Sequence, residues 1–344
     1  MQAVILAAGK STRTYPLTLT KPKPLLKAAN KSIIEWDIDA VKDITNEIII
    51  VTGYKKEMLE KFVSQKYPKL DIKFIQQKEQ LGTGNALLTI KNFIKNEFIL
   101  LMGDNIYSKA DANKIIKHRC SILVKNVKNP ENFGVIIEKN NFLLDIIEKP
   151  ENYVSSLINC ALYSLDKNIF DVLKTIKKSA RNEYELTDAL KITAKSKVRC
   201  VKSVLWLPIT YPWDLLIADR KLRKLMGKSN LIGQNSMING NVKSSSVGNN
   251  CIIDGDVKNS IIMDNAIVSN KSVIEDSIIG ENVNFSGTIK SSSAYSTIKG
   301  KKIFAGKIGA VIGDNAKADN VEIKPGCKIW PNKIVKGKIQ NDIE

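Results

Sequence analysis

Short apolar runs alternate with longer stretches of helical spacing through the first two thirds of the chain. The runs expected to be strands cover 3–6, 47–52, 71–76 and 97–102, and the stretches expected to be helices cover 32–42, 55–67 and 82–93. A short, continuous apolar run is typical of a strand buried on both faces of a parallel sheet. Strands alternating with helices of this length predict a doubly wound, mainly parallel α/β sheet, and ligands of such sheets bind at the carboxyl ends of the strands.

The pattern changes after residue 227, where helical spacing ends and Asn, Ser and Gly punctuate short Val and Ile stretches. Apolar residues lead hexads at Ile232, Ile238, Val247, Ile253, Ile262, Val268 and Ile279, and again at Ile312, Ile323, Ile329 and Val335. A mostly small residue follows many of them four positions later: Ser236, Val242, Cys251, Val257, Ala266, Ser272, Val283, Ala316 and Cys327. A repeat this short predicts a solenoid of stacked coils, in which Cys251 and Cys327 are packing residues.

The repeat, [LIV]-[GAED]-x-x-[STAVC]-x, resembles the hexapeptide repeat of left-handed parallel β-helices. Its spacing fails over 285–310, which we expect to be a protruding loop or an irregular coil. The change of pattern predicts two domains, covering 1–227 and 228–344.

Composition limits the partners of the protein. The formal net charge is +18 at pH 7, but the basic residues are spread along all 344 residues, and all but six of them are lysines. Arginine and aromatic residues do not interleave, so we predict no specific nucleic-acid partner and only weak binding to polyanions. The same charge helps to collect anionic substrates.

The cysteines and the apolar runs indicate a cellular compartment. The five cysteines include no CxxC pair, which argues against a zinc site or a disulfide framework and favours a reducing environment. No apolar run reaches 18 residues, and the first run is too short for a signal peptide. We therefore expect a cytoplasmic protein that does not bind a membrane.

The first strand leads into a turn suited to phosphate. The sequence AVILAAGKSTRTYPLTLTKPKPLL places Gly9 and other small residues directly after the strand, with Arg13 beyond them. Lys23 stands between Pro22 and Pro24, which stiffen the backbone that carries it. Small residues allow a backbone to approach a ligand closely, and the cations attract phosphate oxygens. The stretch contains neither a Walker loop nor the dinucleotide pattern GxGxxG.

This stretch resembles the signature LAAGxGTRxxPLTxxxPKPL of the sugar-1-phosphate nucleotidylyltransferases, matched from Leu6 to Leu25 except at Ser11, where glycine is usual. The likeness is to glucose-1-phosphate thymidylyltransferases and N-acetylglucosamine-1-phosphate uridylyltransferases of the archaeal two-domain type. It implies a Rossmann-like nucleotide-diphospho-sugar transferase fold, a Mg²⁺ cofactor, and NTP and sugar 1-phosphate as substrates. By this resemblance the nucleotide contacts in the turn are Leu6, Ala7, Ala8 and Gly9, and the catalytic cations are Arg13 and Lys23.

Two further family motifs follow strand ends. Asp104, in LLMGDN, directly follows the fourth run, and because Mg²⁺ prefers one or two carboxylates we expect it to be the metal ligand. The segment from Gln76 to Ala86 resembles the family's base-reading segment. It implies that Gln77, Gly82 and Thr83 contact the nucleobase.

Three later triplets match the family's sugar-pocket motifs in order. They are NFGV at 132–135, IEKP at 147–150 and LIN at 157–159. The resemblance implies that Gly134, Glu148 and Asn159 bind the sugar and that Lys149, a third catalytic residue, binds its phosphate. Side-chain carboxylate and amide groups suit the hydroxyl hydrogen bonds that a sugar needs. Residues 183–188, EYELTD, resemble the family's E-x-x-L-T-D, which implies a supporting helix start.

The chain departs from the family at several positions. Pro208 stands where a second metal carboxylate is usual, and Ala161 replaces the glycine of the N-A-G motif. We expect Asp214 to cap the helix that follows it, not to bind metal. In bifunctional relatives a histidine of the β-helix is the general base of an acetyltransferase. The matching residue here is Asn270, which cannot accept a proton near neutral pH, so we expect no acetyl transfer.

The leading hypothesis is therefore a Mg²⁺-dependent sugar-1-phosphate nucleotidylyltransferase that uses UTP or dTTP and assembles as a homotrimer through its β-helix. The rival hypothesis, favoured by Pro208, is a non-catalytic nucleotide-sugar-binding regulatory subunit of the same fold. Release of pyrophosphate distinguishes the two.

Overall fold

The computed structural model describes residues 1–194 and 198–344. Contacts divide the chain into two compact units. The first contains 1–10 and 34–207, and the second contains 11–33 and 208–344. Residues 11–33, which carry most of the signature, therefore pack with the C-terminal part of the chain.

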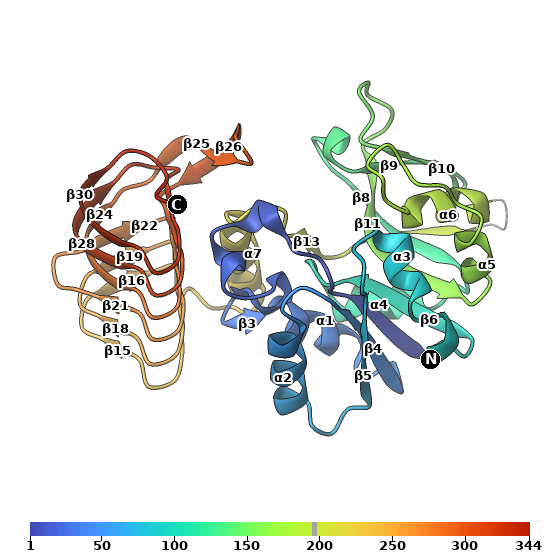
Figure 1. Ribbon diagram of the computed structural model, residues 1–344, viewed down its shortest axis with the longest axis horizontal. Coiled ribbons are helices and arrows are strands. Elements are labelled where there is room, and N and C mark those ends of the chain that lie inside the picture. The colour runs from blue at the N-terminus through green and yellow to red at the C-terminus, as the bar shows by residue number, and fades with distance from the viewer. Residues whose placement is uncertain (195–197) are drawn as a thin grey trace. The chain divides into compact units, whose positions relative to one another are not determined.

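The first unit is built on a sheet of nine strands in the order β5-β4-β1-β6-β11-β8-β12-β10-β9 (Figure 1). The strands are β1 (Gln2–Leu6), β4 (Glu47–Thr52), β5 (Ile72–Gln76), β6 (Glu97–Met102), β8 (Ser121–Asn126), β9 (Gly134–Lys139), β10 (Phe142–Glu148), β11 (Leu157–Asp166) and β12 (Arg199–Lys202). The four predicted strands lie side by side and all pair in parallel, which confirms the Rossmann-like half of the sheet.

The other half of the sheet is mixed. Strand β11 is antiparallel to both β6 and β8, and β10 is antiparallel to β9 and β12, while β12 and β8 pair in parallel. Strands β9 and β10 are joined through Asn140 and Asn141, whose φ angles of 54° and 62° are those of a tight hairpin turn. The predicted alternation of strands and helices, and with it parallel pairing, extends through this region, and the antiparallel pairs depart from it because β9 and β10 follow each other with no helix between them.

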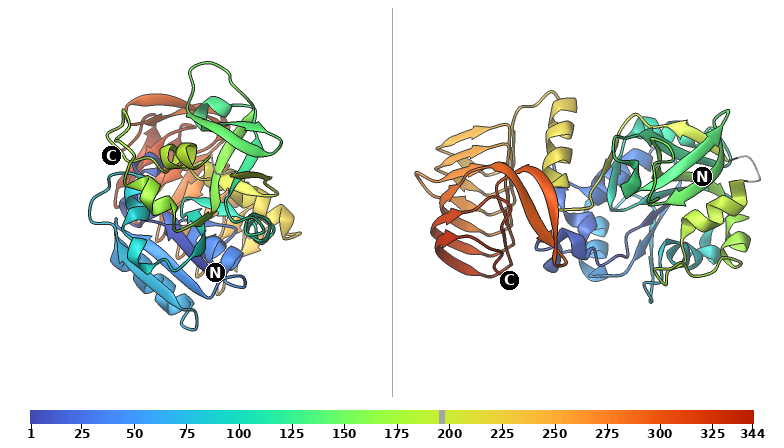
Figure 2. Two further views of the ribbon diagram at one scale, coloured as in Figure 1. Left: turned by 90° about the vertical axis from the view of Figure 1, so that its right-hand side faces the viewer. Right: turned by 90° about the horizontal axis from the view of Figure 1, so that it is seen from above.

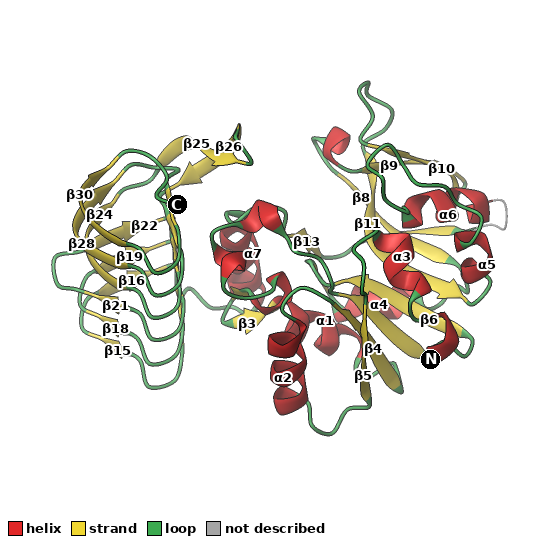
Figure 3. Cartoon of the chain, viewed as in Figure 1, coloured by secondary structure: helices red, strands yellow, loops and turns green. Residues whose placement is uncertain are grey.

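Helices cover the sheet on both faces (Figure 3). They are α1 (Ile33–Val41), α2 (Lys56–Lys66), α3 (Thr83–Leu88), α4 (Lys109–Ile115), α5 (Ile169–Leu173) and α6 (Leu186–Thr193). Buried residues of α3, α5 and α6 pack in one cluster with Val4, Val51 and Leu100 of the parallel strands. The helix predicted over 82–93 ends early, at Leu88, and is followed by a short 3₁₀ turn, Lys91–Phe93. A separate two-stranded sheet joins β7 (Asn105–Tyr107) to β13 (Trp206–Pro208).

The second unit contains the solenoid (Figure 2). One parallel sheet stacks β14 (Leu231–Ile232), β17 (Ser246–Val247), β20 (Ile261–Ile262), β23 (Ile278–Ile279), β27 (Val311–Ile312) and β29 (Lys328–Ile329). A larger parallel sheet contains β15 (Met237–Ile238), β18 (Ile252–Ile253), β21 (Ile267–Val268), β24 (Asn284–Ile289), β22 (Val273–Glu275), β19 (Asp256–Lys258), β16 (Asn241–Lys243), β28 (Lys317–Ile323) and β30 (Ile334–Ile339). Strands stacked in parallel are what the short repeat predicts.

Coil length follows from the register of the first solenoid sheet. Ile232 pairs with Val247, Val247 with Ile262, and Ile262 with Ile279, so two coils of equal length precede a longer one. All four are apolar residues that lead hexads in the sequence, and the larger step to Ile279 is already present in their spacing. The buried apolar residues and both Cys251 and Cys327 lie in one core cluster, so the prediction that these cysteines pack is confirmed.

The irregular stretch is a hairpin. Strands β25 (Ser292–Ile298) and β26 (Lys301–Ile308) pair with each other in an antiparallel sheet of their own and leave the stack (Figure 1). Strand β24, just before the hairpin, still pairs in parallel with β21 and β28, with one register shift between Phe285 and Gly287. The expected protruding segment is therefore present, with more regular structure than a loop.

A ladder of asparagines marks one corner of the solenoid. Asn250, Asn265 and Asn282 have φ angles of 55°, 60° and 57°, a left-handed conformation that asparagine tolerates well. The side-chain amide of each donates to the next, at 3.2 Å and 3.0 Å between the first three. The same ladder continues to Asn315 and Asn332.

The remaining elements of the second unit precede the solenoid in sequence. They are 3₁₀ turns at Thr12–Thr14, Leu17–Leu19 and Lys23–Leu25, a hairpin of β2 (Lys27–Ala28) and β3 (Lys31–Ser32), and helix α7 (Asp214–Leu225). Helix α7 packs on β2.

Candidate active site

The turn after β1 lies where the parallel strands end. The backbone N–H of Ala7 donates to the carbonyl oxygen of Val51 on β4 (2.8 Å), and the N–H of Gly103, after β6, donates to that of Leu6 (2.9 Å). The carbonyl oxygen of Ala8 accepts from the side chain of Gln80 (2.9 Å). The structure therefore places Leu6, Ala7 and Ala8 beside the ends of β4 and β6 and the segment after β5.

Two glycines allow the strand ends to approach this closely. A Cβ atom on Gly53 would lie 2.6 Å from the carbonyl oxygen of Ala8 and 2.9 Å from its Cβ. A Cβ on Gly103 would lie 3.1 Å from the Cβ of Ala7. The turn is packed against both neighbouring strand ends, so its position depends on residues outside the signature.

The loop expected to read the base is held from two sides. The N–H of Gln77 donates to the carbonyl oxygen of Thr52 (2.8 Å), and its side-chain amide donates to Asn85 (2.9 Å). The N–H of Leu186, at the start of α6, donates to the hydroxyl of Thr83 (3.1 Å). Gly82 has a φ of 99°, which favours glycine.

The helix start expected at 183–188 therefore has the supporting role that the family motif implies. The N–H of Gly84 donates to the carbonyl oxygen of Tyr184, and the N–H of Tyr184 donates to that of Leu81, both at 2.8 Å. Helix α6 begins at Leu186, inside the motif.

The expected sugar-binding residues meet on three strands. Gly134 begins β9 and pairs directly with Glu148, the last residue of β10. A Cβ on Gly134 would lie 3.1 Å from the Oε2 atom of Glu148 and 3.7 Å from the Cβ of Asn159 on β11. Three residues that are far apart in sequence thus form one cluster.

Hydrogen bonds fix two members of this cluster. The side-chain amide of Asn159 donates to the hydroxyl of Tyr163 (2.8 Å), and its Oδ1 atom accepts from the N–H of Ala161 (2.8 Å). Lys149 is exposed, has a φ of 47°, and donates its N–H to the carbonyl oxygen of Phe133 (3.0 Å). Its ammonium group is therefore next to the cluster in sequence and open to solvent.

Arg181 belongs to this region although no sequence motif identifies it. Its guanidinium lies 2.9 Å from Glu185 and 3.7 Å from Glu148. Burial raises the pKa of Glu185, while the charge of Arg181 acts to lower it. Arg181 thus links the sugar cluster to the start of α6.

Asp104 follows β6 and lies near a second carboxylate. Asp37, on α1, is fully buried, and neither of its carboxylate oxygens has a hydrogen-bond partner in the part of the chain that the structure describes. Burial, and after it the charge of Asp104, raises the pKa of Asp37 well above its usual range.

A carboxylate at the position of Asp104 fits a divalent cation, which needs few carboxylates when phosphate oxygens and water fill its other positions. No group of three or more potential metal ligands occurs among the described residues. The sequence did offer a signal for Asp37, because it lies on the apolar face of its helix, beside Ile34, Ile38 and Val41.

The second unit holds the two cations of the signature. Arg13 is exposed and lies in the first 3₁₀ turn, and Lys23 is 4% exposed. Both charges act to lower the pKa of Asp214, although its burial is the larger influence and raises it. The three ionisable groups are therefore near one another.

Asp214 does not bond to the helix that it begins. Its Oδ2 atom accepts from the N–H groups of Thr210 (2.7 Å) and Tyr211 (2.8 Å), both before the helix. The expectation that it caps α7 is wrong in this respect: the carboxylate orders the preceding turn, because those two amides point at it.

Ser11, which stands where the signature has glycine, takes a left-handed conformation, a region that glycine favours. Its φ is 53° and its ψ 48°. The hydroxyls of Thr14 (2.7 Å) and Thr18 (2.9 Å) both donate to its carbonyl oxygen. These bonds hold the backbone of the turn at Ser11.

Comparison with known proteins gives a consistent result. Residues 2–222 match the nucleotidyl transferase family. The chain is 36% identical to the bifunctional protein GlmU of Methanococcus maripaludis strain C7, in an alignment that covers 100% of this chain and 96% of that protein. It is 33% identical to the UTP–glucose-1-phosphate uridylyltransferase AglF of Haloferax volcanii, over 65% of this chain and 97% of that one.

A solved structure resembles part of the chain. It is described as a glucose-1-phosphate thymidylyltransferase from Bacillus anthracis in complex with a sucrose, and it superposes with a TM-score of 0.59 at 27% identity, covering 65% of this chain and 95% of that chain. Among the helices of the described residues, none has the length and apolar character required to span a membrane. With the family matched over more than half of its residues, the chain belongs to the nucleotidyl transferase family.

Proposed function

We propose that the chain transfers a nucleotidyl group from a nucleoside triphosphate, with UTP or dTTP favoured, to a sugar 1-phosphate, releasing pyrophosphate. The observation that carries this proposal is the meeting of separate motifs at the ends of the strands. The turn at Ala8 contacts the segment that contains Gln80, and Gly134, Glu148 and Asn159 form a second cluster on the same sheet. Two substrates need two such groups of residues.

In this reaction an oxygen of the sugar phosphate attacks the α-phosphorus of the triphosphate in line, and pyrophosphate leaves. A covalent intermediate is not needed, so the protein contributes alignment and neutralisation of charge. We assign Arg13 to the triphosphate and the leaving pyrophosphate, Lys23 to the α-phosphate and Lys149 to the sugar phosphate.

The nucleotide and sugar contacts are assigned in the same way. Leu6, Ala7, Ala8 and Gly9 present backbone to the nucleotide, and Gln77, Gly82 and Thr83 read its base. Gly134 leaves room beside Glu148 and Asn159 for the sugar hydroxyls. The fixed amide of Asn159 favours one orientation of the sugar.

Magnesium fits the carboxylates of this site. Asp104 would hold the ion; where no cation is bound, burial and the charge of Asp104 favour the neutral form of the nearby Asp37, because both raise its pKa. The bound ion supplies neutralisation of phosphate charge as the leaving group departs.

We further propose that 1–227 act as the transferase domain and that 228–344 form a left-handed β-helix through which the protein assembles as a homotrimer. The parallel register from coil to coil and the hexad pattern support this description. The absence of acetyl transfer stays a prediction. It rests on Asn270, whose Oδ1 atom accepts from the N–H of Lys271 (2.8 Å).

A pyrophosphate-release assay tests the proposal. The full-length protein is incubated with Mg²⁺, each common nucleoside triphosphate and a panel of sugar 1-phosphates. We expect release in at least one combination and a loss of about a hundredfold or more in Arg13→Ala, as when one charge-stabilising donor is removed. Arg119→Ala is the control, because Arg119 makes an exposed ion pair with Asp166 on the far end of β11. Nucleotide binding without release in every combination would establish a regulatory subunit instead.

A further inference from the structure

One corner of the solenoid carries a column of acidic residues. Asp264, Glu281 and Asp314 each precede a left-handed asparagine of the ladder, so they occupy equivalent positions on three successive coils. We call these three residues the acidic column. On the two coils before them the same position is taken by the neutral residues Gln234 and Asn249.

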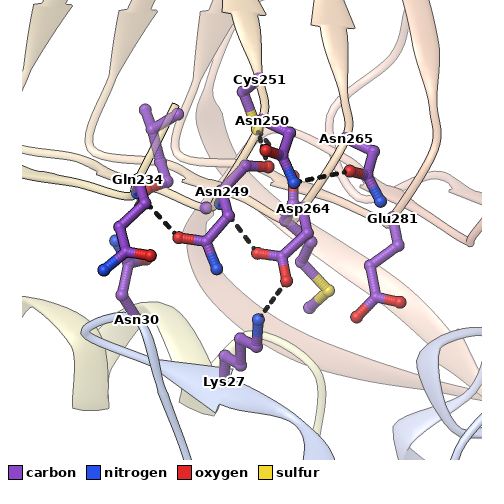
Figure 4. A network of polar contacts seen from close by, with 12 residues as sticks. Lys27, Asn30, Gln234, Asn249, Asn250, Cys251, Asp264, Asn265 and Glu281 are labelled. Carbon is purple, nitrogen blue, oxygen red and sulfur yellow. Dashed lines mark hydrogen bonds and ion pairs between the residues drawn. The ribbon is translucent and has the colours of Figure 1, made fainter. Parts of the chain in front are cut away.

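The acidic column contacts the signature segment. The ammonium group of Lys21 lies 2.5 Å from Glu281 and 3.0 Å from Asp314. The ammonium group of Lys27 lies 2.5 Å from Asp264, and Figure 4 draws this ion pair. The hydroxyl of Thr20 donates to Asp314 (2.6 Å). Residues 20–27 therefore run along the column from the coil of Asp314 to that of Asp264.

The contact continues to the next coil and to α7. The side-chain amide of Asn30 donates to the carbonyl oxygen of Val247 (2.7 Å), one coil beyond Asp264. The N–H of Ala29 donates to Asp219 of α7 (2.8 Å). The segment is thus held at four coils of the solenoid and by a helix.

Each aspartate of the column bonds in two directions. The Oδ1 atom of Asp264 accepts from the backbone N–H of Asn249 (3.0 Å), and its Oδ2 atom receives Lys27. Asp314 bonds in the same way. Its Oδ1 atom accepts from the backbone N–H of Glu281 (2.8 Å), and its Oδ2 atom accepts from the hydroxyl of Thr20 and pairs with the ammonium group of Lys21. A carboxylate fixed to the solenoid backbone through one oxygen presents the other at a defined place.

Burial distinguishes the Lys21–Asp314 pair from ordinary surface ion pairs. Lys21 is 5% exposed and Asp314 is 4% exposed, so removing one charge leaves the other without compensation. An exposed pair on the same solenoid, Lys336 with Asp319 at 2.9 Å, has side chains that are 71% and 60% exposed. Pairs of that kind contribute little.

We propose that the acidic column positions the phosphate-binding segment, so that the solenoid is a working part of the nucleotidyl-transfer site. Asp264 and Asp314 are positioning residues, which act through Lys27 and Lys21 on the backbone that carries Lys23 and Arg13. This inference rests on the proposed function. Because those two cations stabilise the transition state, loosening their segment lowers kcat more than it raises KM.

The test uses the full-length protein and the variants Asp264→Asn and Asp314→Asn. Hydrogen exchange of the amides in 17–31 measures the order of the segment directly, and steady-state pyrophosphate release gives kcat and KM. We expect faster exchange in 17–31, unchanged exchange in the solenoid core, and a loss of kcat of about tenfold or more with KM for the triphosphate changed less than about threefold. Asp319→Asn is the matched control, expected to leave both readouts unchanged.

Charge reversal of the partly exposed Lys27–Asp264 pair provides a second set of variants that should fold. Lys27 and Asp264 are 21% and 22% exposed at their side chains, so Lys27→Asp and Asp264→Lys should each fold. Each single reversal should lower kcat, and the double variant should recover part of the loss in kcat and in slow exchange, because the ion pair is restored while the bond from the N–H of Asn249 is not. Unchanged exchange in Asp264→Asn and Asp314→Asn, or faster exchange with unchanged kcat, overturns the proposal.

Failure of the proposed function gives a different result. If the wild-type protein releases no pyrophosphate in any combination of substrates, the proposed transferase activity is rejected, and the catalytic role of the acidic column is rejected with it. The anchoring of 17–31 is then judged by the exchange measurement alone, in which no change between wild type and variants rejects it.

Discussion

Replacing Gly53 with alanine adds a methyl group where the carbonyl oxygen of Ala8 lies. The added Cβ would be 2.6 Å from that oxygen, and ordinary contact begins at 3.4 Å, so one of the two must move by about 0.8 Å, the difference between the two distances. Strand β4 pairs with β1 on one side and β5 on the other, so its end has little freedom. We expect the turn after β1 to move.

The consequence is larger for catalysis than for stability. A misplacement of about 1 Å can reduce a reaction rate by about a hundredfold, whereas overpacking of one methyl group costs about 1–3 kcal/mol of unfolding free energy. Gly53→Ala should therefore remain folded and lose about tenfold to a hundredfold in kcat for pyrophosphate release. Thermal unfolding and steady-state kinetics on the same preparation measure both effects.

The control separates loss of stability from displacement of the turn. Gly227 has a φ of 66°, and a Cβ there would meet no atom within 4 Å. Gly227→Ala should thus cost about 1–2 kcal/mol through backbone strain alone and leave kcat unchanged. If Gly53→Ala is folded and as active as the wild type, the turn after β1 does not position the substrate.

Other parts of the first unit and the thiols give three more predictions. Gly134→Ala should raise KM for the sugar phosphate by about tenfold with little change in KM for the triphosphate, because the new Cβ lies 3.1 Å from Oε2 of Glu148. Equal changes in both constants would contradict the assignment of Gly134 to the sugar pocket. Lys73→Gln should lower the unfolding free energy modestly at pH 7, because Glu47 loses its hydrogen-bonded cation. Lys73 lowers the pKa of Glu47, so this difference should shrink as the pH falls below 4.5 in urea titrations at several pH values; a constant difference would argue against the pair. Four of the five cysteines are buried and Cys120 is half-buried, and burial raises the pKa of each thiol, so a thiol reagent at pH 8 should modify at most one in the native protein.

Sequence patterns predicted the elements that depend on local periodicity. The strands at 47–52 and 97–102 begin and end where expected, because continuous apolar runs bounded by polar residues leave little choice of boundary. The coil lengths of the solenoid followed from spacing for the same reason. The mixed half of the sheet was not predicted, because pairing direction there depends on turns such as Asn140–Asn141 and on contacts distant in sequence.

In the candidate site, too, local motifs predicted some residues, while others depend on contacts distant in sequence. Motifs identified Gly134, Glu148 and Asn159, and the structure brings these three residues together. Asp37 and Arg181 belong to no motif, since their roles arise from burial and from neighbours far along the chain. A lone acidic residue on an apolar helix face was the one local signal.

The coil that carries the β25–β26 hairpin is much longer than its neighbours, yet the strands before and after it, β23 and β27, stack without interruption. The added residues do not disturb the stacking of the coils, because the hairpin leaves the solenoid and returns to it within the same coil. The Lys299–Gly300 tip is therefore a natural graft point, where a fluorophore or an affinity peptide would be carried without disturbing the layers beneath.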